Sequence, residues 1–185
     1  MKSYELVLML NVSASEAERK AFLTDIESKF KVIDKDEIGV KEICFELKGR
    51  VSKAYLVSYQ VELSSEDIVA LKQALLYSAI LIRYEIFLRT ANQPFFHFDA
   101  LQKEFEKAIE DIKDKRYGQK VNFFTKEENA KYLNWKSVAI LKYYLTRFGN
   151  IKPREYTGNN VKTQKKLRAE IIRARTLGVL PFINH

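Results

Sequence analysis

The segment GVKEICFELKGRVSKAYLVSYQVEL, residues 39–63, decides the fold of the first half of the chain. Within residues 53–62 one set of side chains alternates with a second set: Tyr55, Val57, Tyr59 and Val61 alternate with Ala54, Leu56, Ser58 and Gln60. A period of two is typical of a β-strand. Residues 38–48 predict a second strand, and the polar KGRVS between the two predicts a connecting turn. We therefore expect a β-hairpin here.

The segments on either side of this hairpin complete a recognisable order of elements. Residues 3–10 are a short apolar run that predicts a strand, and residues 14–31 then change to helical spacing. The residues expected on the buried face of this helix are Ala17, Ala21, Phe22, Ile26 and Phe30. After the hairpin, Ser64 and Asp67 have capping-box spacing and predict a helix start, and residues 81–89 return to strand character. The order β-α-β-β-α-β predicts a ferredoxin-like fold.

The remainder of the chain predicts a connecting helix followed by a second domain. We expect a ferredoxin-like domain over 1–92, a linker over 93–117 and a small all-α domain over 118–185, so the fold class is α+β. The linker contains an amphipathic helix over residues 98–113. The apolar residues at helical spacing in it are Phe98, Leu101, Phe105, Ile109 and Ile112.

Two main helices are predicted within the second domain. One is opened by Asn134 and stopped by Gly149, and the other runs from about Asn160 to Thr176. The residues expected to face inward in the first of them are Val138, Leu141, Leu145 and Phe148. So small an interior normally requires a partner surface, and we expect this domain to be marginal alone.

Charge is distributed unevenly along the 185 residues. Residues 1–100 contain 13 basic and 15 acidic residues, whereas residues 101–185 contain 19 basic and 9 acidic residues, for a formal net charge of +8 overall. The second half therefore predicts an anionic partner. The single cysteine, Cys44, permits no internal disulfide and no cysteine-cluster metal site, and no stretch approaches a membrane span. We expect a soluble, unexported protein.

The strongest concentration of positive charge is GNIKPREYTGNNVKTQKKLRAEIIRAR, residues 149–175. At 100° per residue the last helix separates into basic faces and an apolar stripe. One basic side has Lys162, Lys165, Lys166 and Arg173, a second pair is Arg168 and Arg175, and the packing stripe is Leu167, Ile171 and Ala174. Lysine and arginine bind phosphate, so this pattern favours RNA binding; a solvated charged face is the alternative.

A resemblance to a known family runs through this same region. Residues 123–182 closely resemble bacterial small-ribosomal-subunit protein eighteen. The resemblance lies in N-W-K at 134–136, GNIKPREYTG at 149–158, QKKL at 164–167 and IIRARTLGVLPF at 171–182. Some members have cysteine near the position of Asn122, and its absence here argues against metal ligation at that point.

The first half is similar to small-ribosomal-subunit protein six, whose fold is the arrangement predicted above. The similar segments are YELVLML at 4–10, residues 39–63 and ILIRYEIFL at 80–88. Members of these two families bind each other and enter the central domain of the small-subunit RNA as a pair. The resemblance implies a covalent fusion of the two partners, natural or engineered, and a structural role in the small subunit of a bacterial-type ribosome, in a bacterial cytoplasm or an organelle.

The resemblance and the charge pattern together define the expected partners and contact residues. The partners are the central domain of small-subunit rRNA and neighbouring ribosomal proteins, with no membrane, small-molecule substrate, cofactor or metal. The expected RNA-binding residues are Lys152, Arg154, Tyr156, Thr157, Gly158, Asn159, Lys162, Gln164, Lys165, Lys166, Arg168, Arg173 and Arg175. The residues expected in contacts between domains or with proteins are Val7, Met9, Leu56, Phe105 and Ile109. If the strand phases were off by one, the first three would be core instead.

Three other classes of function stay open at this point. A regulator that binds messenger RNA would use the same basic surface, and a purely protein-binding adaptor would use the aliphatic sheet face. An acylphosphatase-like enzyme would suit the first fold, but no phosphate-cradling loop follows the first predicted strand. Because His97 and His185 fall in the linker and at the terminus without a nearby nucleophile in sequence, we expect no catalysis.

Overall fold

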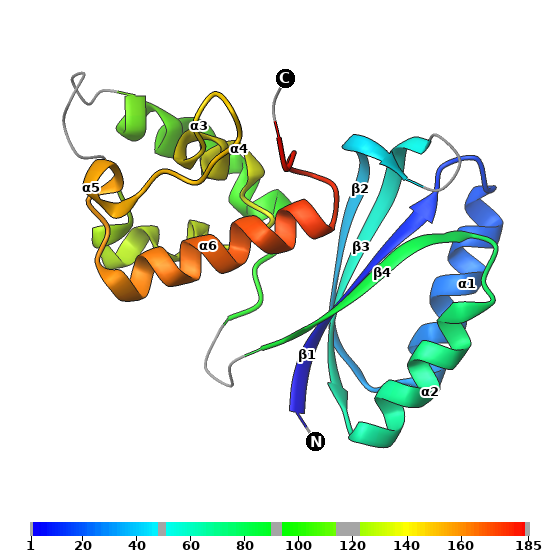
Figure 1. Ribbon diagram of the computed structural model, residues 1–185. Coiled ribbons are helices and arrows are strands. Elements are labelled where there is room, and N and C mark those ends of the chain that lie inside the picture. The colour runs from blue at the N-terminus through cyan, green and yellow to red at the C-terminus, as the bar shows by residue number, and fades with distance from the viewer. Residues whose placement is uncertain (1, 48–50, 90–93, 114–122, 184–185) are drawn as a thin grey trace. The chain divides into compact units, whose positions relative to one another are not determined.

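The chain forms two compact units, residues 1–95 and residues 96–185. The structure, a computed structural model shown in Figure 1, describes residues 2–47, 51–89, 94–113 and 123–183. The predicted domain boundaries at 92/93 and 117/118 lie outside the described residues. The central turn residues 48–50, Asn122 and His185 also lie outside them.

The first unit is a four-stranded antiparallel sheet with two helices on one face (Figure 1). The strand order is β2-β3-β1-β4, so the two central strands are the first and the third in sequence. Its elements are β1 Lys2–Asn11, α1 Glu16–Lys29, β2 Val32–Leu47, β3 Val51–Leu63, α2 Ser65–Leu76 and β4 Leu81–Leu88. This order and pairing confirm the predicted ferredoxin-like fold.

Both helices of the first unit begin with a complete capping box. The Ser64 amide donates to Asp67 Oδ2 at 2.8 Å, and the Asp67 amide donates to Ser64 Oγ at 3.1 Å. Ser15 and Glu18 make the same reciprocal pair at the start of α1. Each box satisfies amides that have no partner within the helix, which explains why the helices start at these serines.

The core of the first unit lies between the sheet and its helices. The buried residues of this cluster are Leu6, Leu8, Leu10, Leu23, Ile26, Val57, Tyr59, Val61, Leu63, Leu71, Leu75 and Leu81. Tyr55 packs against the same cluster, so the predicted phase of β3 is confirmed and the alternative phase is wrong. The predicted buried face of α1 needs one correction: Ala17 and Ala21 are exposed, and Leu23 is buried instead. Leucine buries more apolar area than alanine, so the helix turns Leu23 inward.

Strand β2 is longer than predicted. It begins at Val32 rather than at residue 38, because the charged run Asp34–Glu37 hides the alternation from a hydropathy pattern. Its pairing with β3 shifts register between Glu37 and Gly39, and Gly39 has a φ of 78° that favours glycine.

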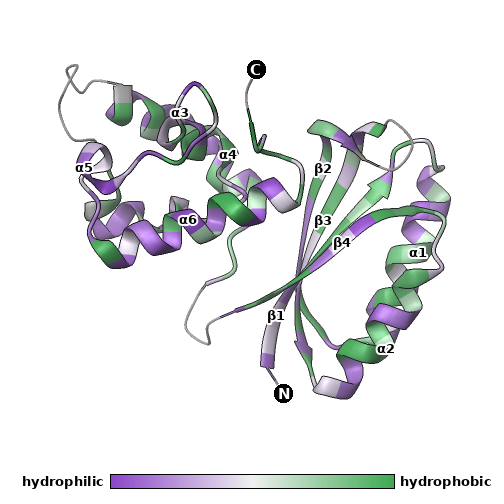
Figure 2. Ribbon diagram, viewed as in Figure 1, coloured by the Kyte–Doolittle hydropathy of each residue, from purple (hydrophilic) through white to green (hydrophobic). Residues whose placement is uncertain are grey.

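The second unit consists of helices and short 3₁₀ turns. Its elements are α3 Phe98–Lys113, 3₁₀ helices Phe123–Thr125 and Glu127–Tyr132, α4 Val138–Leu141, a 3₁₀ helix Lys142–Tyr144, α5 Arg154–Thr157 and α6 Val161–Thr176. The ribbon of α6 is mostly hydrophilic, with apolar positions spaced along it (Figure 2). The predicted helices over residues 98–113 and 160–176 are thus confirmed.

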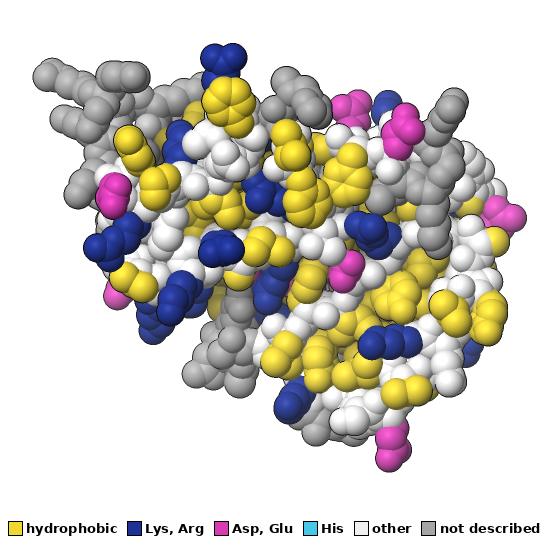
Figure 3. Space-filling model, viewed as in Figure 1, with side chains coloured by type: hydrophobic (Ala, Val, Ile, Leu, Met, Phe, Trp, Pro, Cys, Tyr) yellow, Lys and Arg dark blue, Asp and Glu magenta, His cyan; other side chains and the backbone are white. Residues whose placement is uncertain are grey.

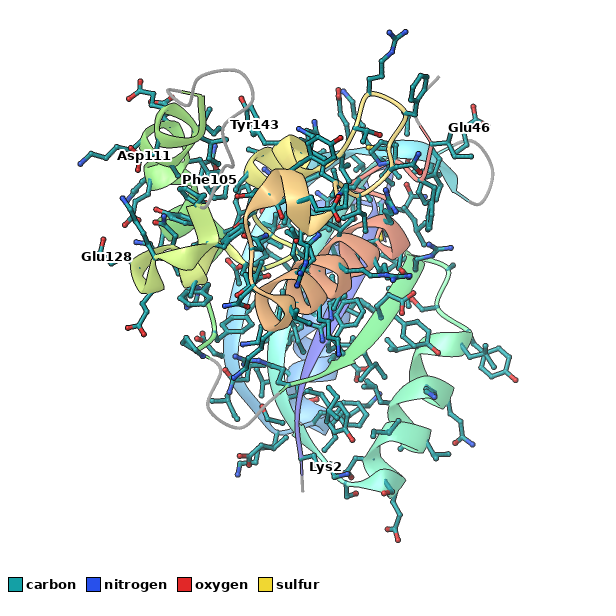
Figure 4. All side chains as sticks on the ribbon, turned by 60° about the vertical axis from the view of Figure 1, so that its left-hand side comes forward. Lys2, Glu46, Phe105, Asp111, Glu128 and Tyr143 are labelled. Carbon is teal, nitrogen blue, oxygen red and sulfur yellow. The ribbon has the colours of Figure 1, made fainter. Side chains whose placement is uncertain are left out.

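Aromatic contacts tie α3 to the rest of the second unit. The Phe105 ring lies 6.4 Å from the ring of Tyr132, and Phe123 lies 5.8 Å from the same ring. Phe124 continues the series, with its ring 4.9 Å from that of Tyr144. Phe105 is labelled on α3 in Figure 4 and is only 7% exposed. Helix α3 therefore supplies a packing surface to residues 123–183 and contributes to the core of this unit. That residues 118–185 would be marginal alone stays a prediction.

The prediction of one continuous helix from Asn134 to Gly149 is wrong, because only short helical segments form within it. Asn134 Oδ1 accepts a hydrogen bond from the Lys136 amide at 3.1 Å, a local turn that competes with helix, and α4 starts only at Val138. Leu145 is extended and forms a β-bridge with Ile151. Gly149, with φ of 85°, lies in the turn that this bridge requires. Phe148, predicted to face inward, is 62% exposed on the same turn.

Candidate RNA-binding surface

Helix α6 presents the largest set of candidate residues. Asn160 caps it, since Asn160 Oδ1 accepts from the Thr163 amide at 2.7 Å. Leu167, Ile171 and Ala174 are fully buried, which confirms the predicted packing stripe. The opposite side of the helix faces solvent, and the exposed cations on α6 are Lys162, Lys165, Lys166 and Arg168.

Gln164 connects α6 to the loop that precedes it. Its Oε1 accepts from Thr157 Oγ1 at 3.0 Å and from Asn159 Nδ2 at 3.1 Å. Its Nε2 donates to the carbonyl oxygen of Lys152 at 2.9 Å. Thr157 and Asn159 are buried, and Gly158 ends α5 with a φ of 70°. One amide side chain thus fixes the loop against the helix.

A groove of about 490 Å³ lies between this loop and the first turns of α6. Four of the residues that line it are cations, and none of the lining residues in the described part of the chain is acidic. The lining residues are Asn150, Ile151, Lys152, Pro153, Arg154, Val161, Gln164, Lys165 and Arg168. Each lining residue on α6 has another three or four positions away, so they occupy one face of the helix: Val161, Gln164, Lys165 and Arg168. The groove is a concave, electropositive site.

Three other predicted residues are exposed without lining the groove. Lys162 and Lys166 project from α6, and Tyr156 on α5 is 68% exposed. Figure 3 shows dark-blue Lys and Arg side chains gathered along this part of the second unit. These positions suit contacts with phosphates along an extended polyanion.

The last two predicted arginines make contacts within the unit itself. Arg173 Nη1 donates to Glu170 Oε1 at 2.8 Å. Arg175 Nε donates to the Pro181 carbonyl oxygen at 3.1 Å, and its Nη2 donates to the carbonyl oxygen of Gly149. Partial burial lowers the pKa of the Arg175 guanidinium, which stays protonated at neutral pH. These groups help to hold the C-terminal segment and the turn in place.

Lys152 also has an internal contact. Its Nζ donates to the carbonyl oxygen of Tyr143 at 2.8 Å, while its amide donates to the carbonyl oxygen of Tyr144 at 2.8 Å. Among the predicted RNA-binding residues, those most available to a ligand are thus Arg154, Tyr156, Lys162, Lys165, Lys166 and Arg168. Contact of any of them with RNA stays a prediction.

The residues predicted for contacts between domains lie on two different units. Val7, Met9 and Leu56 alternate with the core residues of β1 and β3 and so point to the sheet face opposite the helices. Phe105 packs inside the second unit, and Ile109 is half-buried on α3. Their role in a contact between domains or with another protein stays a prediction.

Sequence patterns gave no hint of three buried polar groups in the second unit. Lys136 is 1% exposed, and its Nζ donates to the carbonyl oxygen of Phe96 at 2.9 Å. The Trp135 amide donates to Glu170 Oε2 at 3.0 Å, which places a 6% exposed carboxylate on the packing stripe of α6. Asn134 is the third buried group, and its Oδ1 accepts the hydrogen bond from the Lys136 amide. Charged and amide side chains are mostly exposed in proteins, so residue type offered no signal for the burial of these three groups.

Two further features concern the described ranges: a metal site and a membrane-spanning helix. No group of three or more His, Cys, Asp or Glu side chains there could hold a metal ion. None of the helices in those ranges is long and apolar enough to cross a membrane.

Comparison with known proteins identifies the family of the second unit. The family model described as ribosomal protein S18 matches residues 129–180. The chain is 40% identical over 72 residues to small ribosomal subunit protein bS18 of Mycoplasma capricolum subsp. capricolum, covering 39% of this chain and 95% of that protein. It is 36% identical over 69 residues to the bS18 of Enterococcus faecalis, covering 37% of this chain and 86% of that protein.

Among solved structures, the crystal structure of 30S ribosomal protein S6 from Thermotoga maritima matches 57% of this chain and 96% of that one, with 17% sequence identity and a TM-score of 0.44. A likeness of this size leaves the family of the first unit a prediction. The motifs at 134–136, 149–158 and 171–182, by contrast, lie within or across the region matched at 129–180. Through its second unit, the chain belongs to the ribosomal protein S18 family.

Proposed function

We propose that the protein is a structural component of the small ribosomal subunit, in which the second unit binds small-subunit rRNA. The observation that carries this proposal is the coincidence of the S18 family match at residues 129–180 with the electropositive groove and the exposed cations of α6. Phosphates of neighbouring RNA segments repel one another, and a rigid cluster of lysine and arginine reduces that repulsion. Binding of this kind supports assembly of a folded RNA and requires no catalytic group.

The finer part of the proposal concerns the partner site and the first unit. By its ferredoxin-like topology, and by the motif resemblance of its strands, the first unit is proposed to be a counterpart of ribosomal protein S6. The chain would then be a covalent version of a protein pair that binds the central domain of the RNA. A short connection gives an effective concentration of the order of millimolar, so pairing becomes intramolecular and one copy of each partner is always supplied.

Cosedimentation is the direct test. Lysate of the host would be separated on a sucrose gradient, and the protein would be detected with an antibody in each fraction. We expect it in the small-subunit fractions and in intact ribosomes, in constant proportion to another small-subunit protein. An abundant protein that stays at the top of the gradient, or that follows messenger RNA instead, would contradict the proposal.

A further inference from the structure

The groove between the loop 150–158 and α6 has two chemically different parts. Ile151, Pro153 and Val161 are apolar, and they lie among the cations that line the same depression. A site for phosphate alone needs donors and positive charge, and it gains nothing from an apolar wall. The combination suits a ligand with an apolar face and a charged backbone.

We propose that this groove binds one unpaired nucleotide of the RNA, with its base against the apolar wall and its phosphates on the surrounding cations. This inference rests on the proposed function and names the form of RNA that the site takes. Bases in a duplex are stacked inside the helix, whereas an unpaired base can turn outward and insert into a protein. The volume of about 490 Å³ is in the range of ordinary ligand pockets.

The cations come from both of the segments that form the groove. Arg154 belongs to α5, while Lys165 and Arg168 project from consecutive turns of α6. All three are exposed, so their charged groups can move onto a ligand. A guanidinium can bind phosphate with two parallel hydrogen bonds or stack on a base, and a lysine acts as a mobile point charge. Cations from two segments can therefore hold the phosphates beside an inserted base.

Gln164 can supply a polar contact at the wall. Its Oε1 already accepts two hydrogen bonds, and one hydrogen of its Nε2 is used by the Lys152 carbonyl oxygen. The amide group carries two such hydrogens, which leaves one for an acceptor atom on a base. The same bonds fix the position of the side chain in advance, so less conformational freedom is lost on binding.

The backbone around the wall is also held before any ligand arrives. Leu145 pairs with Ile151, and the Thr146 amide donates to the carbonyl oxygen of Asn150 at 2.7 Å. The Gly158 amide donates to the carbonyl oxygen of Arg154 at 2.8 Å and closes α5. A preformed concave site of this kind favours one ligand geometry over others.

The test compares three RNA probes with the full chain at one fixed salt concentration. The probes are a strand of abasic nucleotides that carries one central uridine (the intact strand), a strand of the same length that is abasic throughout (the abasic strand), and an RNA duplex of the same length. Fluorescence polarisation gives the affinity for each. We expect the intact single strand to bind about fivefold or more tightly than the abasic strand, since the abasic strand has no central base to insert into the groove. The duplex should also bind more weakly than the intact strand.

Two pairs of variants locate the effect in the groove. Val161→Ser removes part of the apolar wall, and its matched control is Ile172→Ser, which alters an exposed residue of α6 that does not line the groove. Lys165→Gln removes a lining cation, and Lys166→Gln removes the neighbouring cation outside it. Val161→Ser and Lys165→Gln should reduce the preference for the intact strand, whereas Lys166→Gln should weaken all three probes by the same factor. Circular dichroism of each variant checks that α6 stays folded.

Each outcome decides between the proposals. If the chain binds the three probes equally, or if each groove variant behaves like its control, RNA binding stands and the nucleotide site is rejected. If the chain binds none of the probes, the RNA-binding role and the nucleotide site are both rejected. Cosedimentation with small subunits in that last case would leave only protein contacts to explain its place there.

Discussion

Arg168 and Arg175 lie seven residues apart on α6, and a helical wheel assigns them the same role. The structure separates them. Arg168 lines the groove and is exposed, whereas Arg175 donates to the carbonyl oxygens of Gly149 and Pro181 and lies 5.8 Å from the centre of the Phe182 ring. A position on a wheel gives the direction of a side chain, but it cannot show which carbonyl groups a later turn brings near.

This difference predicts opposite effects of alanine at the two positions. Arg175→Ala leaves two carbonyl oxygens without their donor, and we expect it to lower the free energy of unfolding by about 1–3 kcal/mol. Arg168→Ala should change that free energy by no more than about 0.5 kcal/mol and should weaken RNA binding instead. Urea unfolding and RNA titration of both variants measure the two quantities. A loss of no more than about 0.5 kcal/mol for Arg175→Ala would show that Arg175 has no structural role.

Gln164 shows how one uncharged residue can serve both the fold and the site. Gln164→Leu has a similar size but removes every hydrogen bond to Lys152, Thr157 and Asn159, so we expect a loss of about 1–3 kcal/mol in the free energy of unfolding. Gln164→Glu keeps the acceptor and adds negative charge to the groove. It should reduce RNA affinity more than it reduces stability. If Gln164→Leu melts at the wild-type temperature, the loop is held by other contacts.

At the scale of whole elements, long periodic helices were predictable and short irregular ones were not. The strands of the first unit, its two helices, α3 and α6 were all predicted, from an apolar run, an apolar period or a capping box, and most of them with nearly correct bounds. The region 134–149 fails because its conformation is decided by single hydrogen bonds, such as that from the Lys136 amide to Asn134 Oδ1, rather than by a repeated pattern. Ile151, which lines the groove, pairs with Leu145 of that region, so the shape of the groove could not be predicted either.

Helix α3 was assigned to a linker for a related reason. Its amphipathic pattern shows that one face is buried, but a pattern does not identify what buries it. The structure pairs Phe105 with Tyr132, and Glu104 accepts a hydrogen bond from the Tyr132 hydroxyl at 2.7 Å. Tyr132 follows the segment 114–122 in sequence. A pattern of spacings within one helix therefore cannot reveal its contact with α3.

Helix α6 allows its buried and exposed faces to be compared by two substitutions of similar size. Leu167 is fully buried, and Leu167→Ala should destabilise the second unit by about 2–5 kcal/mol because it leaves a cavity. Ile172 is 44% exposed on the same helix, and Ile172→Ala should cost less than about 1 kcal/mol. Thermal unfolding followed by circular dichroism compares the two variants. A small effect of Leu167→Ala would mean that the stripe is not the anchor of α6.

At the scale of the whole molecule, charge separates along the chain in the same way as the fold does. The excess of basic residues lies in residues 101–185, while residues 1–100 contain slightly more acidic than basic residues. An electrostatic role for the second unit leaves the first unit to supply shape and protein contacts. The division of charge can be counted from the sequence, because net charge needs no knowledge of three-dimensional contacts. The matching division of roles stays a prediction.

Salt dependence of RNA binding tests this division in the intact chain. Six candidate cations face the groove or the surface beside it: Lys152, Arg154, Lys162, Lys165, Lys166 and Arg168. If they neutralise about six phosphates, counterion release gives a slope of roughly −4 to −5 in a plot of log affinity against log salt concentration. Replacing both Lys162 and Lys166 by glutamine should reduce the magnitude of that slope by about 1 for each phosphate that is no longer neutralised.

Replacing two lysines of the first unit, Lys29 and Lys72, by glutamine is the control, because it changes the net charge equally and should leave the slope unchanged. A slope that responds equally to both pairs would mean that net charge, rather than the surface of α6, determines binding.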